Sequence, residues 1–319
     1  MTDHRTTQAP RGRIFDRVLT EGAASREAAR AGHPEVGFEH LLLGVLVNGG
    51  PAARLLMDAG VGLSEARSAL DALLREDLAL LGVDTPLPVP GGGGDEAAAP
   101  HLPLGPRLSD LVAECPTSGG DRVLLAALID DEGGRVRRLL DRLGADADRI
   151  RRVLGEPAGS GAATTARAEG GDPFADSGPA PEGWEHSDCV LDVPVSAGRI
   201  WDLVSDPARR DVWDAGAASS RVLDDGSVEL TPHHGTAYRE SIADSVPGSE
   251  ITWAREGDED AAPRTLRIAV EPLGEHARVH LRLGWPNALR GRIANRVVRW
   301  FVRQNLRMNA QSIVHAAAS

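Results

Sequence analysis

Apolar residues in the first half of the chain recur every three or four positions, which is the spacing of one face of a helix. Three such sets precede residue 80: Leu42, Val45 and Leu46; Leu55 and Leu56; and Leu63, Ala66, Leu70 and Leu74. Glycines separate the sets. Each set therefore predicts a short helix, and the region predicts a helical bundle.

The period changes from 3.6 to 2 after about residue 185, as expected for strands. Strand-like runs bounded by turn residues cover 189–193, 219–223, 227–230, 236–242, 250–255, 265–270 and 279–283. Two short helices, 197–204 and 209–213, are predicted after the first strand. A long helix from about residue 287 to 317 closes the chain. This order predicts an α+β domain behind an all-α domain.

Two stretches are poor in large apolar residues and interrupt these patterns. Residues 155–184 are rich in Gly, Ala, Pro and Ser, and residues 86–100 read PLPVPGGGGDEAAAP. Such compositions cannot bury enough surface to offset the entropy of ordering, so 155–184 is predicted to be a flexible linker. The expected domains are 13–154, with repeats at about 13–85 and 101–154, and 185–319.

The first domain contains an internal duplication. The tripeptide Arg-Leu-Leu occurs at residues 54–56 and again at 138–140, and at the same spacing each is followed by a glycine and an arginine. The residues at 39–43 and 121–125 also correspond, with a small insertion between the two matches. A duplicated helical bundle predicts two repeats with the same arrangement of helices.

Charge and composition exclude whole classes of chemistry. All 35 cationic residues are arginines, so there is no lysine for a P-loop or for a Schiff base. The net charge of −12 opposes binding to nucleic acid. No apolar run is long enough to span a membrane, and no secretory h-region opens the chain, so a cytoplasmic protein is expected. The two cysteines have no metal-ligand spacing, and neither a metal nor another cofactor is expected.

One motif in the first repeat is long enough to be specific. Gly32-His33 is followed at residues 37–44 by Gly-Phe-Glu-His-Leu-Leu-Leu-Gly. Residues 13–154 thereby closely resemble the N-terminal repeat domain of ClpC-type Clp ATPases. The resemblance implies an all-α, pseudo-twofold module of two four-helix repeats that docks adaptors and substrates. The ATPase modules of those unfoldases are excluded, because no Walker lysine is present.

The same resemblance implies a recognition site. In the family, the Glu of the Gly-x-Glu-His motif is linked to binding of phosphoarginine marks, which here points to Glu39 with His40, and to Asp121 in the second repeat. A carboxylate suits a guanidinium through paired hydrogen bonds. The structural alternative is that Glu39 pins the start of a helix and His40 is a hydrogen-bonded core residue. Asp121 departs from the pattern, because it is shorter than Glu and is followed by Arg122.

The C-terminal domain resembles the SRPBCC superfamily of START-type and polyketide-cyclase-like proteins. The resemblance rests on the order of elements and on the spacing of Trp201, the Asp206-Pro207 pair and Trp213. It implies a helix-grip fold, in which a curved sheet wraps around the last helix and encloses a cavity for an apolar ligand. The candidate lining residues are those expected to point inward: Tyr238, Trp253, His280, Trp285, Trp300 and Gln304.

For the C-terminal domain, ligand binding is favoured over catalysis, because the sequence contains neither the order of a Ser-His-Asp triad nor a close pair of carboxylates that could act as acid and base. The six arginines after Pro286 are expected to seat the last helix on an acidic sheet rather than on a membrane or nucleic acid. The leading hypothesis is a non-enzymatic adaptor, competitor or decoy in Clp-dependent proteolysis, with Clp components or their clients and a small apolar ligand as partners. The alternatives are an aromatase/cyclase-like enzyme and a lipid or polyketide carrier.

Overall fold

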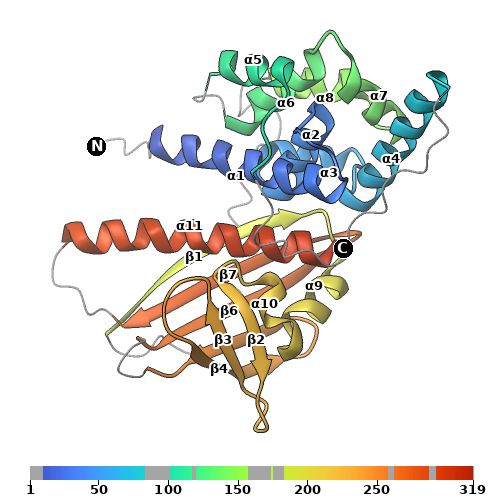
Figure 1. Ribbon diagram of the computed structural model, residues 1–319. Coiled ribbons are helices and arrows are strands. Elements are labelled where there is room, and N and C mark those ends of the chain that lie inside the picture. Colours follow the sequence, from blue (N-terminus) through green and yellow to red (C-terminus); the bar gives the residue numbers. More distant parts are fainter. Residues whose placement is uncertain are drawn as a thin grey trace. The chain divides into compact units, whose positions relative to one another are not determined.

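The computed structural model describes residues 10–82, 101–116, 120–156, 174, 183–257, 262–286 and 292–318, excluding the side chains of residues 10–15 and 292–297 (Figure 1). The chain divides into two compact units, Met1–Gly161 and Ala162–Ser319, which are called the helical unit and the sheet unit below. Two stretches with the composition of linkers, residues 86–100 and most of 155–184, lie outside the described residues.

The described part of the helical unit consists of two sets of four helices, as predicted. The first set is α1 (Pro10–Arg30), α2 (Phe38–Asn48), α3 (Pro51–Asp58) and α4 (Leu63–Leu80). The second set is α5 (Pro106–Glu114), α6 (Gly120–Asp130), α7 (Arg135–Arg142) and α8 (Ala147–Gly155).

Gly44, the last residue of the motif at residues 37–44, allows α1 and α2 to pack closely. A Cβ atom on Gly44 would lie 2.5 Å from the carbonyl oxygen of Thr20 and 2.9 Å from the Ala24 side chain, so no other residue fits without a shift of the helices. Beside this contact, Leu41, Leu42 and Leu43 are fully buried. The Leu-Leu-Leu-Gly part of the motif is therefore explained by packing.

Backbone hydrogen bonds join the two repeats. Val36, which precedes α2, forms a parallel bridge with Leu104, which precedes α5. The Val36 N–H donates to Pro103 at 2.8 Å, and the Gly105 N–H donates to Val36 at 3.0 Å. The segments that lead into α2 and α5 are thus held side by side, and they set the position of α2 relative to α5.

The described part of the sheet unit contains one seven-stranded antiparallel sheet and one long helix. Its elements in chain order are β1 (Trp184–Val193), α9 (Ala197–Val204), the 3₁₀ helix Pro207–Arg209, α10 (Arg210–Trp213), β2 (Ala217–Val222), β3 (Val228–Pro232), β4 (Tyr238–Val246), β5 (Glu250–Arg255), β6 (Arg264–Leu273), β7 (His276–Pro286) and α11 (Arg292–Ala317). The strand order is β1-β7-β6-β5-β4-β3-β2. The predicted fold class, an all-α region followed by an α+β helix-grip arrangement, is confirmed.

Helix α11 packs against β1 and β7. Arg299 of α11 pairs with Glu185 of β1 at 3.2 Å, and Glu185 lies opposite Trp285 in the sheet register. Because side chains alternate between the two faces of a strand, these contacts identify the helix-facing face of the sheet. The opposite face carries ion pairs such as Arg278 with Asp192, at 2.7 Å.

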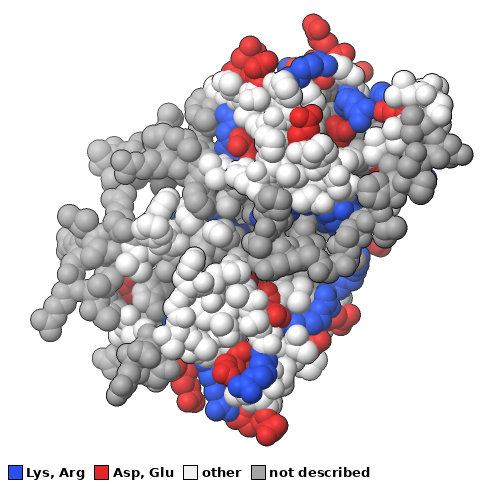
Figure 2. Space-filling model, viewed as in Figure 1, with Lys and Arg blue, Asp and Glu red and all other residues white. Residues whose placement is uncertain are grey.

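Charges of both signs are interspersed on the surface of each unit. In the view of Figure 2, acidic and basic side chains lie next to one another over the helical unit and over the sheet unit. Exposed pairs such as Arg137 with Asp148 and Arg151 with Asp130, both at 2.7 Å, are of this kind. Among the described residues, no single helix is long and apolar enough to cross a membrane; α2 and α3 would reach that length only together, and they are bent by 100°.

Candidate binding sites

The Gly-x-Glu-His run forms the start of α2. The N–H of Gly37 donates to Nδ1 of His40 at 2.8 Å, and Nε2 of His40 lies 2.7 Å from Nδ1 of His33. Because Nδ1 of His40 accepts a hydrogen bond, its proton is assigned to Nε2, which donates to His33. His40 is only 2% exposed, and burial lowers its pKa to about 4. His40 is therefore a neutral residue that closes the first turn of α2.

Glu39 reaches into the second repeat. Its carboxylate accepts a hydrogen bond from Nη2 of Arg135, the first residue of α7, at 2.7 Å, and the other amino group of Arg135 donates to Asp77 at 2.5 Å. Burial alone would raise the pKa of Glu39, but the Arg135 hydrogen bond and charge outweigh it and hold the pKa below its ordinary value. Glu39 is thus an ionised, nearly buried carboxylate that already holds a guanidinium.

Asp121 is the residue equivalent to Glu39 in the second repeat, but it binds a backbone N–H and not a guanidinium. Its Oδ2 accepts a hydrogen bond from the N–H of Ala52, in the first turn of α3, at 2.9 Å. Gly50 makes this approach possible, because it has a φ of +96° and its Cβ would lie 2.7 Å from the same oxygen. Burial raises the pKa of Asp121. Arg122 turns to the end of α8, where it donates to the carbonyl of Val153 at 2.6 Å. Each repeat therefore supplies a carboxylate to the start of a helix in the other.

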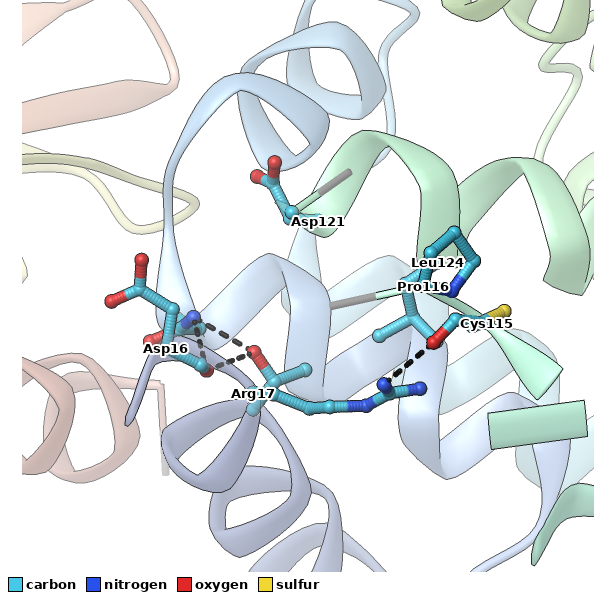
Figure 3. Close-up of a pocket in the computed structure, with 9 residues that line it drawn as sticks. Asp16, Arg17, Cys115, Pro116, Asp121 and Leu124 are labelled. Atoms are coloured by element: carbon cyan, nitrogen blue, oxygen red, sulfur yellow. Dashed lines mark hydrogen bonds between the residues drawn. The ribbon is translucent and has the colours of Figure 1, made fainter. Parts of the chain in front are cut away.

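A small cavity lies beside Asp121, between α1, α2, α5 and α6 (Figure 3). Its volume of about 30 Å³ is enough for one water molecule. Its polar walls are hydrogen-bonded: Arg17 donates to the carbonyl of Cys115 at 2.9 Å, and Asn48 donates to Thr20 at 2.8 Å. There is no room here for an arginine side chain in this conformation, so the second-repeat carboxylate lacks a ready recognition pocket.

Replacing Asp121 with alanine should cost the helical unit about 1 kcal/mol of unfolding free energy, because the first turn of α3 loses its capping acceptor. Urea unfolding followed by circular dichroism at 222 nm measures this. Asp121→Asn keeps an acceptor oxygen and should lose less than half as much. Equal losses in the two variants would contradict the capping role.

The interior of the sheet unit contains a charged cluster, which consists of Arg210, Asp214, Glu240, Arg264 and the hydroxyl of Tyr238. Nη2 of Arg210 pairs with Glu240 at 2.8 Å, and Nη2 of Arg264 binds the other oxygen of Glu240 at 2.7 Å. Arg210 also lies 2.8 Å from Asp214, although the two groups are not aligned for a hydrogen bond. Arg264 donates to the Tyr238 oxygen at 3.0 Å. We call these five residues the interior ion cluster.

Two tryptophans enclose the deepest charge of this cluster. The guanidinium carbon of Arg210 lies 4.0 Å from the ring centre of Trp213 and 5.4 Å from that of Trp253. All three side chains are under 2% exposed. The Trp253 N–H donates to the carbonyl of Val204 at the end of α9, at 3.1 Å. Trp253 therefore packs on a buried cation, where an apolar cavity wall was expected.

The six predicted pocket residues do not share one space. Tyr238, Trp253 and Trp285 lie on the helix-facing face of the sheet. His280 lies on the opposite face, beside Arg278 and Arg282 in the strand alternation, and its Nε2 is 3.8 Å from Glu271. The expectation that His280 points inward is corrected by this register, because its neighbours Val279 and Leu281 take the inward positions of β7.

The two predicted pocket residues on α11 are also separated. Trp300 is 40% exposed and packs edge-to-face on Phe301, with ring centres 4.9 Å apart. Gln304 is 8% exposed, and its side-chain oxygen has no hydrogen-bond partner among the described residues. Gln304 therefore stays a candidate for contact with a bound molecule, whereas Trp300 lies at the surface.

The residues that sequence analysis missed are the charged members of the interior ion cluster. One signal for them was present: Glu240 stands between Tyr238 and Ile242, in the inward register of β4. An acid at an inward position requires a buried cation. In the helical unit the partner of Glu39 was missed, because Arg135 lies far along the chain and in the other repeat.

Comparison with known proteins gives a family match within the helical unit. A model of the Clp repeat (R) N-terminal domain matches residues 19–80. Over 152 residues, the chain is 32% identical to the chloroplastic chaperone protein ClpC of Pisum sativum, which is 44% of this chain and 15% of that protein. It is 30% identical over 154 residues to a chloroplastic ClpA homologue of Brassica napus, covering 46% of this chain and 16% of that protein. The chain thus spans less than a fifth of the length of these relatives.

Among solved structures, similarity is found to a START superfamily protein of Mycobacterium smegmatis, with 16% identity and a TM-score of 0.35, covering 41% of this chain and 94% of that one. The Zhui aromatase/cyclase of a Streptomyces species is similar with 14% identity and a TM-score of 0.32, covering 42% of this chain and 92% of that one.

Proposed function

We propose that this chain, whose residues 19–80 are a Clp repeat (R) N-terminal domain, is a non-enzymatic and ATPase-free adaptor, competitor or decoy in Clp-dependent proteolysis. The helical unit would bind a Clp component or a Clp client. The absence of lysine supports the ATPase-free part of the proposal, because a P-loop needs that side chain to reach the nucleotide phosphates.

The observation that carries the proposal is the Glu39 carboxylate, which holds the guanidinium of Arg135 at 2.7 Å. An arginine or phosphoarginine on a client offers the same group to the same oxygens. Arg135 is 36% exposed and keeps a second partner in Asp77, so it can release Glu39 without losing all of its pairing. His40 would act as a positioning residue. Asp121 is left out of the binding site, because its carboxylate caps α3.

Glu39→Gln should weaken binding of a fluorescent phosphoarginine peptide at least tenfold, because the charge that pairs with the guanidinium is removed. Fluorescence anisotropy with the full chain measures the affinity. The matched control is Glu76→Gln, since Glu76 forms an exposed pair with Arg142 at 2.6 Å. Unchanged affinity in Glu39→Gln, with helicity intact, would remove Glu39 from the binding site.

The sheet unit's part in the proposal is to bind a small, mainly apolar ligand on the helix-facing face, where Tyr238, Trp253 and Trp285 lie. The rival assignments, an aromatase/cyclase-like enzyme and a lipid or polyketide carrier, place their ligand in the same unit. Native mass spectrometry of the purified chain tests for a retained small molecule. A pull-down from the source cytosol tests for a Clp partner, and a retained ligand without any such partner would favour the rivals.

A further inference from the structure

Helices α5, α6 and α8 of the second repeat border an open groove of about 650 Å³ (Figure 1). Most of its lining comes from one stripe on each of two helices. The stripes are Arg107, Asp110, Leu111 and Glu114 on α5 and Val123, Ala126, Ala127 and Asp130 on α6. Residues three and four positions apart share one face of a helix, so each stripe is a face about two turns long. We call this space the α5–α6 groove.

The floor of the groove is apolar. Leu111, Val123, Ala126 and Ala127 line it, and all four are intermediate in exposure. The core of the helical unit uses the opposite side of α6, through the buried residues Leu124, Leu125, Leu128 and Ile129. The floor is therefore an apolar helix face that the core does not use.

The corresponding face in the first repeat is covered by a helix. When the match between residues 39–43 and 121–125 is extended along α2, the equivalents of the α6 stripe are Leu41, Gly44, Val45 and Asn48. All four are buried. Helix α1 covers them, because Gly44 lies against Thr20 and Ala24, and Asn48 donates to Thr20 at 2.8 Å. Helix α1 has 21 residues, whereas α5 has nine, and the α6 face stays open.

The rims of the groove are acidic. Five carboxylates line it against two guanidinium groups, an excess of three negative charges: Asp110, Glu114, Asp130, Asp131 and Glu132 against Arg107 and Arg151. Both arginines are paired, Arg107 with Asp131 at 2.9 Å and Arg151 with Asp130 at 2.7 Å. The other three acids are exposed, and no partner for them is found among the described residues. An acidic rim over an apolar floor favours a partner that carries cations beside an apolar stripe.

We propose that the α5–α6 groove binds a cationic amphipathic helix of a partner protein. The apolar face of that helix packs on Val123, Ala126 and Ala127, and its cations lie between the rim carboxylates. A helix is assigned because the equivalent face of α2 is covered by one, and because apolar anchors at helical spacing suit a groove between two helices. This inference rests on the proposed binding function of the helical unit. It adds a surface that does not include Glu39 and names the chemistry of the partner.

The test uses a labelled amphipathic peptide of about 18 residues, long enough to form a helix. One face of the peptide carries leucine and alanine, and the other carries arginine. A second peptide has glutamate in place of every arginine. Fluorescence anisotropy with the full chain measures both affinities. The arginine peptide should bind at least tenfold tighter than the glutamate peptide, because only the arginine peptide complements the rims.

Ala127→Arg places a long cation on the groove floor and should lower the affinity for the arginine peptide at least tenfold. The matched control is Ala113→Arg, because Ala113 is exposed on α5 and does not line the groove. The double variant Asp110→Asn with Glu114→Gln should lower the affinity about fivefold. Asp71→Asn with Glu76→Gln removes two acids from α4 and controls for the change in net charge.

Equal affinities for the two peptides, or an unchanged affinity in Ala127→Arg, would overturn the inference. Sedimentation velocity of the free chain tests another occupant. A dimer that is lost in Ala127→Arg and kept in Ala113→Arg would assign the groove to a second copy of the chain and overturn the partner helix. Binding of the phosphoarginine peptide, measured in parallel, separates the two proposals. If that peptide binds and the arginine peptide does not, only the groove assignment falls, and if neither binds, both proposals fall.

Discussion

Arg210→Met should reduce the unfolding free energy of the sheet unit by about 3–5 kcal/mol, since removing one partner from a buried ion pair leaves the other charges uncompensated. Arg210 is fully buried, and it is the residue that links Asp214 to Glu240 at 2.8 Å on each side. Arg264 remains within 3.8 Å of Asp214 and compensates only part of the lost charge. The stacking of Arg210 on Trp213 is lost as well.

Urea unfolding followed by tryptophan fluorescence measures this loss, because every tryptophan reports on the sheet unit. The matched control is Arg221→Met. Arg221 also pairs with a glutamate, Glu229, at 2.5 Å, but its side chain is 72% exposed, so the control should lose less than 1 kcal/mol. If both variants lost the same small amount, the interior ion cluster would have no special part in the stability of the sheet unit.

Lowering the pH from 7 to 4 should cost the helical unit about 3 kcal/mol through His40 alone. Burial moves the pKa of His40 from 6.5 to about 4 in the folded chain. Between these values the unfolded chain binds a proton that the folded chain does not, so stability falls as the pH falls through this window. This part of the unfolding free energy is fully present above pH 6.5. A second proton on His40 would have to bind Nδ1, because Nε2 already carries the proton that it donates to His33. Nδ1 accepts the N–H of Gly37, and that hydrogen bond would be lost.

Circular dichroism at 222 nm across pH 4 to 7, with urea, measures the effect. A loss of helix without a change in tryptophan fluorescence belongs to the helical unit, which contains no tryptophan. His40→Asn keeps an oxygen acceptor near the position of Nδ1 and cannot titrate in this range. The variant should therefore show a flatter pH dependence than the parent chain, and an unchanged slope would exclude His40 as the titrating group.

Sequence periodicity predicted the elements well where one face of the element is apolar. The first strand of the sheet was predicted from residue 189 but begins at Trp184. Near the start of this strand, the side chains on the face away from α11 are polar and exposed, as at His186 and Asp188. Ion pairs to the neighbouring strand, such as Arg282 with Asp188 at 2.7 Å, stabilise this part of the strand. Such pairs join residues far apart along the chain, so no local pattern reveals them.

The residues of the candidate sites could be predicted only where they lie close together along the chain. The motif pointed to Glu39 and His40, because both belong to one helix start. The partners that decide their chemistry come from elsewhere: Arg135 lies in the second repeat, and the cations around Glu240 come from α10 and β6. The inward direction expected for His280 was wrong, because a shift of one residue in a strand exchanges the two faces.

The exchange of carboxylates between the repeats has a consequence for how the helical unit folds. Glu39 contacts the first residue of α7, Asp121 caps α3, and Val36 bridges to Leu104. The first repeat therefore takes a capping acceptor of α3 from the second, and the second takes the carboxylate partner of Arg135 from the first. A fragment that ends near residue 80, where the family match ends, would lose Asp121 and the bridge together. We therefore expect the two repeats to unfold together as one cooperative unit, although each repeat has its own set of four helices.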